Sequence, residues 1–301
     1  MGAGSIGSVI GGHLAEAGYD VTLIDVWREH IDTINKNGLH IYGVSGDRLV
    51  RVKAATPDME MEPMDYIILS VKAYDTRRAL EFASHIIKKD TCILSIQNGI
   101  IPLEDFMAAG EIPYILRGVT NHGATLMGPG KVYHAGRGKT YIGCLTTARE
   151  KAMEMVEIFN NSGLEAEYVA DIDSILWSKL VVNIAINPLT AIARCRNGDL
   201  LSIPELIELM DMAIGEALKI AEALGIKLLY GDAYNHVRSI ARMTANNKSS
   251  MLQDIEKGRK TEVDYLNGVI VKYGEELGID TPVNRVLLKL IKSIEMLSQK
   301  S

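Results

Sequence analysis

Cysteine is scarce in this 301-residue chain, which contains only three. Cys92, Cys144 and Cys195 lie far apart and form no C-x-x-C pair. This spacing offers neither a disulfide framework nor a set of zinc ligands. We therefore expect reduced, buried cysteines and no metal site.

Positive charge and long apolar runs are also in short supply. The chain has 32 Lys and Arg against 38 Asp and Glu, a formal net charge of −6, whereas nucleic-acid binders depend on basic side chains that contact phosphates. No uninterrupted apolar run is long enough to span a bilayer, and no basic leader segment follows Met1. We expect a cytoplasmic protein whose partners are small molecules rather than nucleic acids or membranes.

Strand and helix patterns alternate through the first half of the chain. Short apolar runs rich in β-branched residues are typical of strands that are buried on both faces. The predicted strands lie at 19–26, 64–71, 90–100, 114–128, 130–143 and 164–170, with a hairpin over 39–56 and helices at 30–39, 75–87 and 148–162. This alternation predicts an α/β fold with a Rossmann-type, doubly wound parallel sheet.

Only helical patterns remain after about residue 170. The predicted helices cover 174–193, 202–226, 262–278 and 281–297. Ser202 and Glu205 predict a capping box, Gly225 and Gly278 predict helix ends, and Pro282 fits a first helical turn. The sequence thus predicts a dinucleotide-binding domain at 1–170 and an all-α domain at 171–301.

A glycine-rich turn opens the chain. Gly2, Gly4 and Gly7 fit the pattern G-x-G-x-x-G. The first glycine permits a tight turn, the second lets the backbone approach a pyrophosphate, and the third allows close packing of helix on strand. A helix, a turn at Gly18 and a strand follow in the order that a dinucleotide-binding motif requires. We favour this interpretation over a glycine-rich loop without a ligand.

Asp25 and Arg28 give opposing indications about the nucleotide. Asp25 ends the predicted strand at the place where a carboxylate binds the ribose hydroxyls of NADH and repels the 2′-phosphate of NADPH. Arg28 can pair with that phosphate, or it can be a solvated surface side chain. The preference between NADH and NADPH stays open at this point.

The strand that should lead into the glycine turn is missing, because only Met1 precedes Gly2. In the strand order 3-2-1-4-5 this strand occupies the middle of the sheet. Its absence would leave two neighbouring strands with an unpaired edge each. Our hypothesis is that the natural chain begins several residues upstream, with Met1 ending that strand. The alternative is that the chain begins here and the fold adapts.

A polar stripe crosses an otherwise apolar helix at 177–191. Lys179, Asn183 and Asn187 are spaced i, i+4 and i+8 and therefore share one face. Buried ammonium and amide groups are costly unless they are hydrogen-bonded, so a buried stripe would need partners. The alternative is a stripe that faces solvent.

A second polar cluster lies at 246–268. It contains Asn247, Ser250, Gln253, Asp254, Glu262 and Asp264. Taken alone, Ser249 or Ser250 is suited to cap a helix, and Glu262 is suited to a first helical turn.

With these clusters and the glycine turn, the chain resembles the ketopantoate reductase (2-dehydropantoate 2-reductase) family over nearly its whole length. The matching segments are G-x-G-x-x-G at 2–7, SVKAYD at 70–75, QNG at 97–99, WSKLVVNIAINPLTA at 177–191 and SSMLQDIEKGRKTEVDYLNG at 249–268. The resemblance implies a Rossmann domain, a helical domain of the 6-phosphogluconate-dehydrogenase C-terminal-like type, and a site in the cleft between them. It implies reduction of ketopantoate to (R)-pantoate, usually with NADPH, on the route to pantothenate and coenzyme A.

The resemblance also implies roles for individual residues. Lys179 would be the general acid, and Glu262 would hold the hydroxyl of the substrate. The residues that would position the substrate are Asn183, Asn187, Asn247 and Ser250. Those that would bind the cofactor are Gly2, Gly4, Ser5, Ile6, Gly7, Asp25, Arg28, Lys72 and Asn98, with Asn98 close to the nicotinamide.

Other interpretations remain open from the sequence. A related reductase of another 2-oxo acid or an imine would keep the lysine, and a nucleotide-binding regulator would show no turnover. Asp25 departs from the arginine expected of a strict NADPH enzyme, so NADH is an alternative cofactor. The apolar stripes of the C-terminal helices fit a packed core and a homodimer interface equally well.

Overall fold

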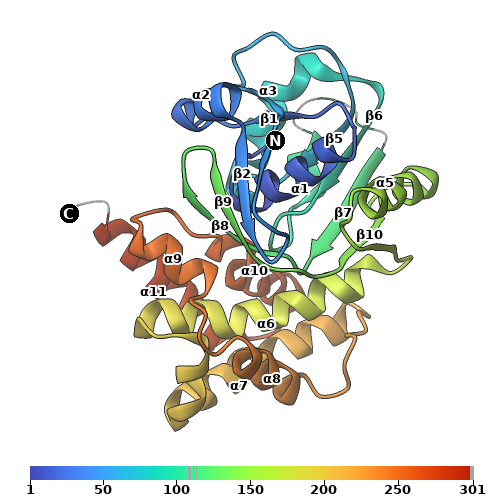
Figure 1. Cartoon of the computed structure of the whole chain (residues 1–301). Helices are drawn as coiled ribbons and strands as arrows, with labels where there is room; N and C mark the ends of the chain where they lie inside the picture. The colour runs from blue at the N-terminus through green and yellow to red at the C-terminus, as the bar shows by residue number, and fades with distance from the viewer. Residues whose placement is uncertain (108–109, 111, 113, 299–301) are drawn as a thin grey trace. The chain divides into compact units, whose positions relative to one another are not determined.

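The computed structural model describes residues 1–107, 110, 112 and 114–298. The chain divides into two compact units, which are treated separately below (Figure 1). Unit 1 comprises Met1–Gln97 and Pro102–Ile172, and unit 2 comprises Asn98–Ile101 and Asp173–Ser301. The short loop Asn98–Ile101 thus belongs to the second unit, although the sequence on both sides of it belongs to the first.

Unit 1 contains a five-stranded sheet and a separate two-stranded sheet. The five strands have the order β11-β10-β7-β6-β5, and β1 pairs with β4. Their bounds are β1 Thr22–Ile24, β4 Lys53–Ala55, β5 Met64–Leu69, β6 Ile87–Ser95, β7 Tyr114–Thr120, β10 Thr140–Cys144 and β11 Ala166–Tyr168. The β1–β4, β5–β6, β6–β7 and β10–β11 pairs are parallel. The α/β fold class is confirmed, although β10 runs antiparallel to β7.

A four-stranded sheet of order β3-β2-β9-β8 completes the strands of unit 1. Its members are β2 Leu39–Gly43, β3 Arg48–Val50, β8 Gly123–Gly128 and β9 Lys131–Gly136. The predicted hairpin is formed by β2 and β3, but β4 leaves it to pair with β1. Strands β8 and β9 were expected in the parallel sheet and instead pair antiparallel. The alternating burial along β9 explains this difference, since one of its faces is solvated.

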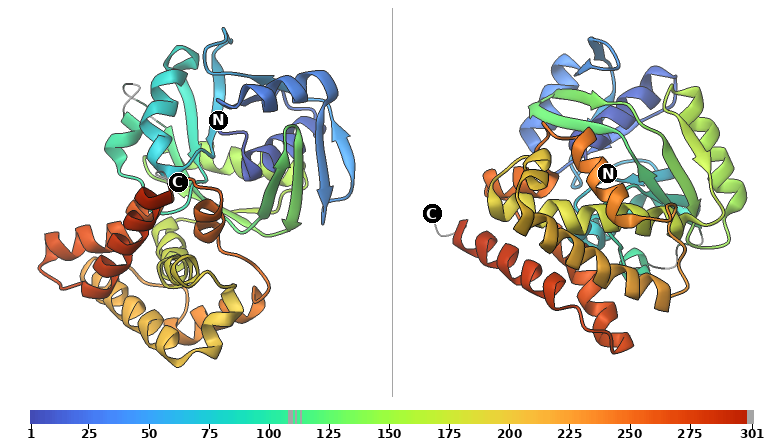
Figure 2. Two further views of the ribbon diagram at one scale, coloured as in Figure 1. Left: turned by 90° about the vertical axis from the view of Figure 1, so that its left-hand side faces the viewer. Right: turned by 90° about the horizontal axis from the view of Figure 1, so that it is seen from below.

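The helices of unit 1 pack on these sheets (Figure 2). They are α1 Ser5–Glu16, α2 Arg28–Asn37, α3 Thr76–Ala83, α4 Leu103–Phe106 and α5 Arg149–Asn161, with short 3-10 turns η1 Ala73–Asp75 and η2 Ser84–Ile86. Ile10 and Leu14 of α1 and Phe159 of α5 share a core with Leu94 and Leu116 of the central strands. Asp75 is the N-cap of α3, and its side chain forms no capping hydrogen bond there.

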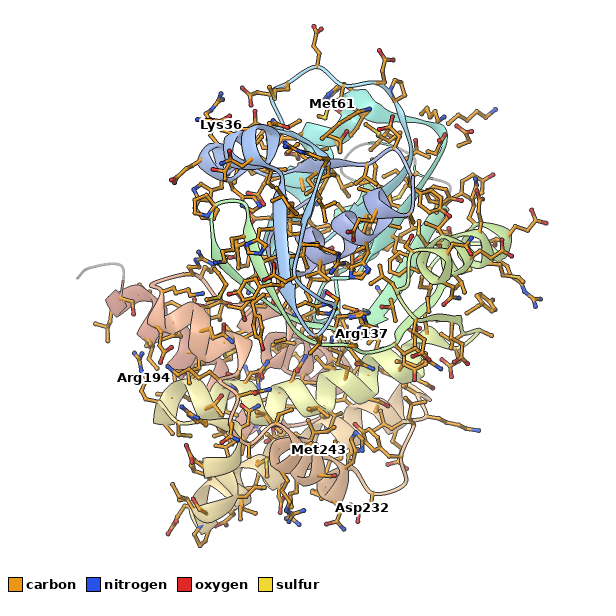
Figure 3. The ribbon with its side chains drawn as sticks, in the orientation of Figure 1. Lys36, Met61, Arg137, Arg194, Asp232 and Met243 are labelled. Atoms are coloured by element: carbon orange, nitrogen blue, oxygen red, sulfur yellow. The ribbon has the colours of Figure 1, made fainter. Side chains whose placement is uncertain are left out.

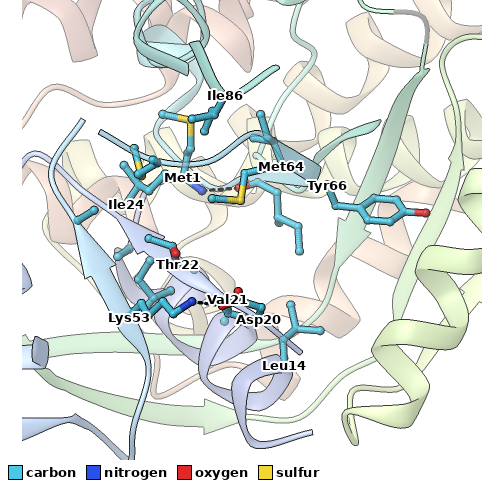
Figure 4. Close-up of a pocket in the computed structure, with 18 of the residues that line it drawn as sticks. Met1, Leu14, Asp20, Val21, Thr22, Ile24, Lys53, Met64, Tyr66 and Ile86 are labelled. Carbon is cyan, nitrogen blue, oxygen red and sulfur yellow. Dashed lines mark hydrogen bonds and ion pairs between the residues drawn. The ribbon is translucent and has the colours of Figure 1, made fainter. Parts of the chain in front are cut away.

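A cavity of about 690 Å³ lies between β1 and β5 (Figure 4). At one end of it the Met1 ammonium donates to the Ile68 carbonyl (2.7 Å), and Ser70 N donates to the Met1 carbonyl (2.8 Å). On the other side Gly2 N donates to the Ile24 carbonyl (2.8 Å). Among the described residues no strand lies between β1 and β5. The sheet is therefore split at the position where the sequence lacks a strand.

Unit 2 is helical throughout its described part. Its elements are α6 Ile172–Ala193, η4 Asn197–Ser202, α7 Pro204–Ala223, α8 Ala233–Met243, α9 Ser250–Glu256, η5 Val263–Tyr265, α10 Asn267–Leu277 and α11 Pro282–Ser298. No strand occurs within residues 173–298, as predicted. Helix α8, which begins after Asp232 and ends at Met243 (both labelled in Figure 3), was not anticipated.

The predicted capping box of Ser202 and Glu205 is wrong. Ile203 is the N-cap of α7, and Pro204 is its first residue. Ser202 instead ends η4, and its hydroxyl donates to the Asp199 carbonyl (2.7 Å). The preceding 3-10 turn thus uses the serine that the sequence pattern assigned to α7.

Helix α6 contains no uninterrupted apolar run of membrane-spanning length, but within the described residues it is long and apolar enough overall to be a candidate membrane span. Residues Ile172–Ala193 satisfy that criterion by length and composition, but 78% of the apolar window is buried inside the protein. Val181, Ile184 and Ala185 are fully enclosed. A buried core helix of this kind meets the same criterion as a membrane span.

Candidate functional site

The glycine turn has the geometry of a dinucleotide cradle. Gly2 has φ of +86°, and a Cβ atom there would lie 2.5 Å from Val71 N. A Cβ atom on Gly7 would collide with the Gly2 carbonyl, so α1 can approach the turn only because this residue is glycine. Gly4 has no neighbour within 4 Å of its Cβ position and leaves open space before α1. The backbone geometry at the three glycines is therefore compatible with the motif.

The first turn of α1 adds donors to this cradle. The N–H groups of Ser5, Ile6 and Gly7 have no acceptor within the helix, because the first intrahelical bond runs from Ser8 N to the Gly4 carbonyl (3.0 Å). The Ser5 hydroxyl accepts from Leu126 N (2.9 Å) and keeps its own proton to donate. The Ile6 side chain packs on the core, so only its backbone can face a ligand. Such a helix terminus suits a pyrophosphate.

Asp25 and Arg28 lie where the sequence predicts, directly after β1. Asp25 Oδ1 accepts from Trp27 N (3.0 Å), which fixes the carboxylate at the end of the strand. Arg28 begins α2 and forms an ion pair with Asp58 (NH2 to Oδ2, 3.2 Å). Asp58 was assigned no role from the sequence, because it lies 30 residues from Arg28 and no local pattern connects the two.

Gln97 is a positioning residue that sequence reasoning missed. Its side chain is buried, and Nε2 donates to the Val71 carbonyl (3.0 Å) and to Thr76 Oγ1 (2.8 Å). Oε1 accepts from Ser95 Oγ (2.9 Å). The amide thereby holds the segment that contains the predicted cofactor residue Lys72, which is half-buried ahead of η1. Its place in the QNG segment was the available signal.

The polar stripe on α6 is half-buried or buried along its length. Asn187 is only 7% exposed, and Lys179 and Asn183 are half-buried. Burial lowers the pKa of Lys179 to about 8, although the negative charge of Glu262 acts to raise it. The solvent-facing alternative is thus excluded. At neutral pH the lysine remains protonated but holds its proton less tightly than an exposed lysine does.

Glu262 shares this environment with Lys179. It is 6% exposed and directly precedes η5, so it is a buried carboxylate that interacts electrostatically with the lysine. A buried charge needs a compensating partner, and the two groups supply opposite charges. Residues 83 positions apart in the sequence are therefore coupled by the fold of unit 2.

Helix α9 begins against the same helix α6. Thr190, one turn beyond Asn187, donates from Oγ1 to Ser249 Oγ (2.7 Å). Ser249 is the N-cap of α9 and accepts from Leu252 N (3.1 Å), so the predicted cap is confirmed at that residue. Ser250 is exposed at the first position of α9. Thr190 was missed, although its spacing continues the Asn183–Asn187 stripe.

The loop with Asn98 packs against the segment that follows Glu262. Ile100 N donates to the Tyr265 carbonyl (3.1 Å). Gly99 has φ of +81°, and a Cβ atom there would collide with the Tyr265 backbone. Unit 2 therefore contains Asn98 together with the predicted substrate residues. Asn247, by contrast, is exposed before α9, and its carbonyl accepts from Asn197 N (3.0 Å).

Within the described residues 1–107, 110, 112 and 114–298, no group of three or more His, Cys, Asp and Glu side chains is arranged to hold a metal ion. Cys92 is buried and unpaired, whereas Cys144 and Cys195 are half-buried. Burial raises the pKa of the Cys92 thiol to about 12, so this cysteine is an inert part of the core.

Comparison with models of protein families shows to which family this chain belongs. The model described as "Ketopantoate reductase PanE/ApbA" matches residues 1–147, and its C-terminal counterpart matches residues 171–295. The chain belongs to the ketopantoate reductase family. Its fold, a parallel-sheet domain followed by helices, is the fold of that family.

Individual relatives extend this result. A 2-dehydropantoate 2-reductase of Pyrococcus horikoshii is 41% identical over 99% of this chain and 97% of its own length. One of Archaeoglobus fulgidus is 39% identical over 98% and 96%. A ketopantoate reductase structure from Ralstonia eutropha has a TM-score of 0.92 at 33% identity and covers 99% of this chain and 97% of its own. The ternary structure of D-mandelate dehydrogenase with NADH and anilino(oxo)acetate has a TM-score of 0.93 at 29% identity, with coverage of 99% and 98%. All four are named as reductases or dehydrogenases, so the family is one of oxidoreductases.

Proposed function

We propose that this protein is an NAD(P)H-dependent 2-dehydropantoate 2-reductase that converts ketopantoate to (R)-pantoate. The observation that carries the proposal is the buried pair of Lys179 and Glu262, in which burial lowers the lysine pKa to about 8. The family and the names of relatives that are 39–41% identical over nearly the full length support it. The reaction belongs to the formation of pantothenate and coenzyme A, and we propose the cytoplasm as its location.

Lys179 is the proposed general acid. A bound nicotinamide would supply a hydride to the ketone carbon of the substrate. Negative charge then develops on the ketone oxygen, and an ammonium close to that oxygen stabilises the charge and delivers the proton. A lysine with a pKa of about 8 is protonated at neutral pH and releases its proton more readily than an exposed lysine.

Substrate positioning is assigned to the polar groups of unit 2. Glu262 accepts a hydrogen bond from the hydroxyl of the substrate and keeps Lys179 charged. Asn183, Asn187, Asn247 and Ser250 supply donors for the keto acid end and the hydroxyl. Their amide and hydroxyl groups suit an anionic substrate in a chain whose net charge is −6, because local donors rather than the overall field must attract it.

Cofactor binding is assigned to unit 1 and to the Asn98 loop. The pyrophosphate would lie on the open backbone at Gly4 and on the N–H groups of Ser5, Ile6 and Gly7. Lys72 and Asn98 would lie along the dinucleotide, with Asn98 close to the nicotinamide. The resemblance favours NADPH, whereas Asp25 favours NADH.

We propose that residues 1–170 form the dinucleotide-binding domain and residues 171–301 the substrate domain. We also retain a homodimer as a proposal. Val286, Leu290 and Leu297 are 45–66% exposed and lie along α11 at helical spacing. A mass determined by light scattering at several protein concentrations tests it, and a monomer mass throughout would exclude the dimer.

The first experiment follows the loss of absorbance at 340 nm with ketopantoate, using NADH and NADPH separately. Turnover with either nucleotide supports the proposal. Nucleotide binding without turnover on any 2-oxo acid would instead support a regulator.

A reductase of another 2-oxo acid is the second candidate. The observation that favours it is the TM-score of 0.93 to D-mandelate dehydrogenase in complex with NADH and anilino(oxo)acetate. Ketopantoate and phenylglyoxylate should therefore be compared at equal concentrations. A higher kcat/KM for phenylglyoxylate would replace ketopantoate as the substrate.

A further inference from the structure

One arginine and two acidic residues come from the ends of separate strands at one edge of the two-stranded sheet. Strand β1 pairs with β4 in parallel, with Ile24 opposite Ala55, and Asp25 N continues the ladder to the Ala55 carbonyl (3.2 Å). The residues after β1 and after β4 therefore emerge at the same edge of the sheet. Asp25 and Arg28 come from the first strand end, and Asp58 comes from the second.

A tight turn holds Asp58 in place after β4. Met59 N donates to the Thr56 carbonyl (3.0 Å), and Pro57 occupies the second position of the turn. Proline at this position fixes the backbone of such turns. The segment continues past Met61, which is labelled in Figure 3, toward β5. Asp58 Oδ2 thereby lies 3.2 Å from Arg28 NH2, and both side chains are about two-thirds exposed, at 69% and 67%.

We propose that Asp58 determines the dinucleotide preference of this enzyme by competing with the 2′-phosphate of NADPH for Arg28. This inference rests on the proposed function, because it requires that the adenosine ribose lies at the end of β1. Asp25 accepts hydrogen bonds from the ribose hydroxyls of NADH. Asp58 forms an ion pair with the Arg28 guanidinium, which a 2′-phosphate would need as its own partner. Asp58 is thus a specificity residue that the nucleotide-binding motif does not contain.

The charges around Arg28 support this assignment. Asp25 and Asp58 outnumber the single guanidinium, and Glu29 adds a further exposed carboxylate in the first turn of α2. A 2′-phosphate carries a charge of about −1.5 to −2 and would enter a region that is already negative. An exposed ion pair is weak, so Arg28 can exchange partners once its competitor is removed.

The test compares dissociation constants for NADH and NADPH, measured by titration of dinucleotide fluorescence at low ionic strength. The variants are Asp58→Asn, Arg28→Ala and the double variant. We expect Asp58→Asn to tighten NADPH binding about fivefold, in the range of one exposed ion pair, and to change NADH binding less than twofold. The gain should vanish in the double variant and shrink at high salt.

Asp20→Asn is the matched control. Asp20 forms an exposed ion pair with Lys53 (2.6 Å) at the opposite, amino ends of β1 and β4. This substitution changes the net charge equally but lies away from the proposed ribose site. An equal gain in NADPH affinity from Asp20→Asn, or a gain from Asp58→Asn that persists without Arg28, would overturn the inference.

The same titration separates this inference from the proposed function. A wild type that binds neither dinucleotide would overturn both. A wild type that binds dinucleotide with the expected Asp58 effect but does not reduce ketopantoate would overturn only the substrate assignment.

Discussion

At the scale of single residues, we propose Lys179 as the group that carries most of the chemistry. Its ammonium is held on a helix whose neighbouring side chains are Leu180, Val181 and Val182. Burial disfavours the charged form and lowers its pKa, and Glu262 acts in the opposite direction. The balance leaves a charged acid at neutral pH, as proton delivery to a ketone oxygen requires.

Replacing Lys179 with alanine should lower kcat for ketopantoate by about 10²- to 10⁴-fold, the usual contribution of a positioned acid. Nucleotide affinity should stay within about twofold, because α6 belongs to the other unit from the glycine turn. Lys272→Ala, an exposed lysine on α10, is the matched control. Turnover of Lys179→Ala close to wild type would remove the lysine from this role.

The pH dependence of kcat/KM reports the same group. The protonated lysine is the active form, so activity should be constant below about pH 8 and fall about tenfold per unit above it. Glu262 acts to raise the lysine pKa, so Glu262→Gln should move the descending limb to lower pH. An unchanged limb in this variant would show that the two groups are not coupled.

At the scale of elements, the space between β1 and β5 is the most unusual feature of unit 1. This cavity is lined by Thr22, Ile24, Met64 and Tyr66 (Figure 4). The backbone amino and carbonyl groups of Met1 lie at one end of it. Burial lowers the pKa of the Met1 amino group to about 6, so the charged form is disfavoured at this position. A strand in this space could pair with both neighbours.

A five-residue valine- and isoleucine-rich segment fused ahead of Met1 should raise the melting temperature by about 5 °C or more. It would supply ladder hydrogen bonds to β1 and β5, bury apolar side chains and convert the ammonium into a peptide bond. A fused Gly-Ser segment of equal length is the control. Equal melting temperatures, measured by circular dichroism, would contradict the prediction.

Helix α11 begins on a buried carboxylate from another helix. Glu216 of α7 accepts from Val283 N (2.7 Å) and Asn284 N (2.9 Å), as well as from Asn284 Nδ2 (2.7 Å). Asn267 extends this network, because its side-chain amide donates both to Asn284 Oδ1 and to the Ile184 carbonyl of α6 (3.1 Å). This network fixes four helices relative to one another within unit 2.

Glu216→Ala should lower the free energy of unfolding by about 3 kcal/mol, because it leaves buried donors without acceptors. Glu275→Ala is the matched control, since Glu275 pairs with Arg285 near the start of the same helix but is 59% exposed. The control should change stability by less than about 0.5 kcal/mol. Urea unfolding measures both, and similar losses would show that the network is not stabilising.

At the scale of the whole molecule, we expect acid stability to depend on a histidine cluster in unit 1. His122 Nδ1 lies 3.0 Å from His134 Nε2, and His134 Nδ1 lies 2.9 Å from Ser45 Oγ. Arg48 donates to His13 Nε2 (3.0 Å), which requires an unprotonated nitrogen there. Burial lowers the pKa of His134 to about 4, and the neighbouring His122 and His13 act in the same direction.

The melting temperature should therefore fall between about pH 6.5 and pH 4. In this window an unfolded histidine binds a proton while folded His134 does not, so stability is present above the unfolded pKa and is lost as pH falls. His134→Gln removes the titration and should flatten this part of the profile, as measured by thermal unfolding across pH. A profile that is as steep in this variant would assign the acid sensitivity elsewhere.

The sequence by itself determined the order of most elements, although not helix α8, and the identity of the polar stripe. Periodicities of 2 and 3.6 residues distinguish strands from helices locally, and the spacing of Gly2, Gly4 and Gly7 requires no knowledge of distant residues. Lys179, Asn183 and Asn187 share a face through helix geometry alone. These features depend on interactions within about one helical turn.

Only the tertiary structure decided which distant residues meet. The coupling of Lys179 with Glu262, the contact of Arg28 with Asp58 and the packing of Gly99 on Tyr265 join segments that no local pattern connects. Strands β8 and β9 likewise do not belong to the predicted parallel sheet, because strand pairing depends on which faces are buried across the whole fold. Sequence spacing sets what one element presents, whereas packing sets what it touches.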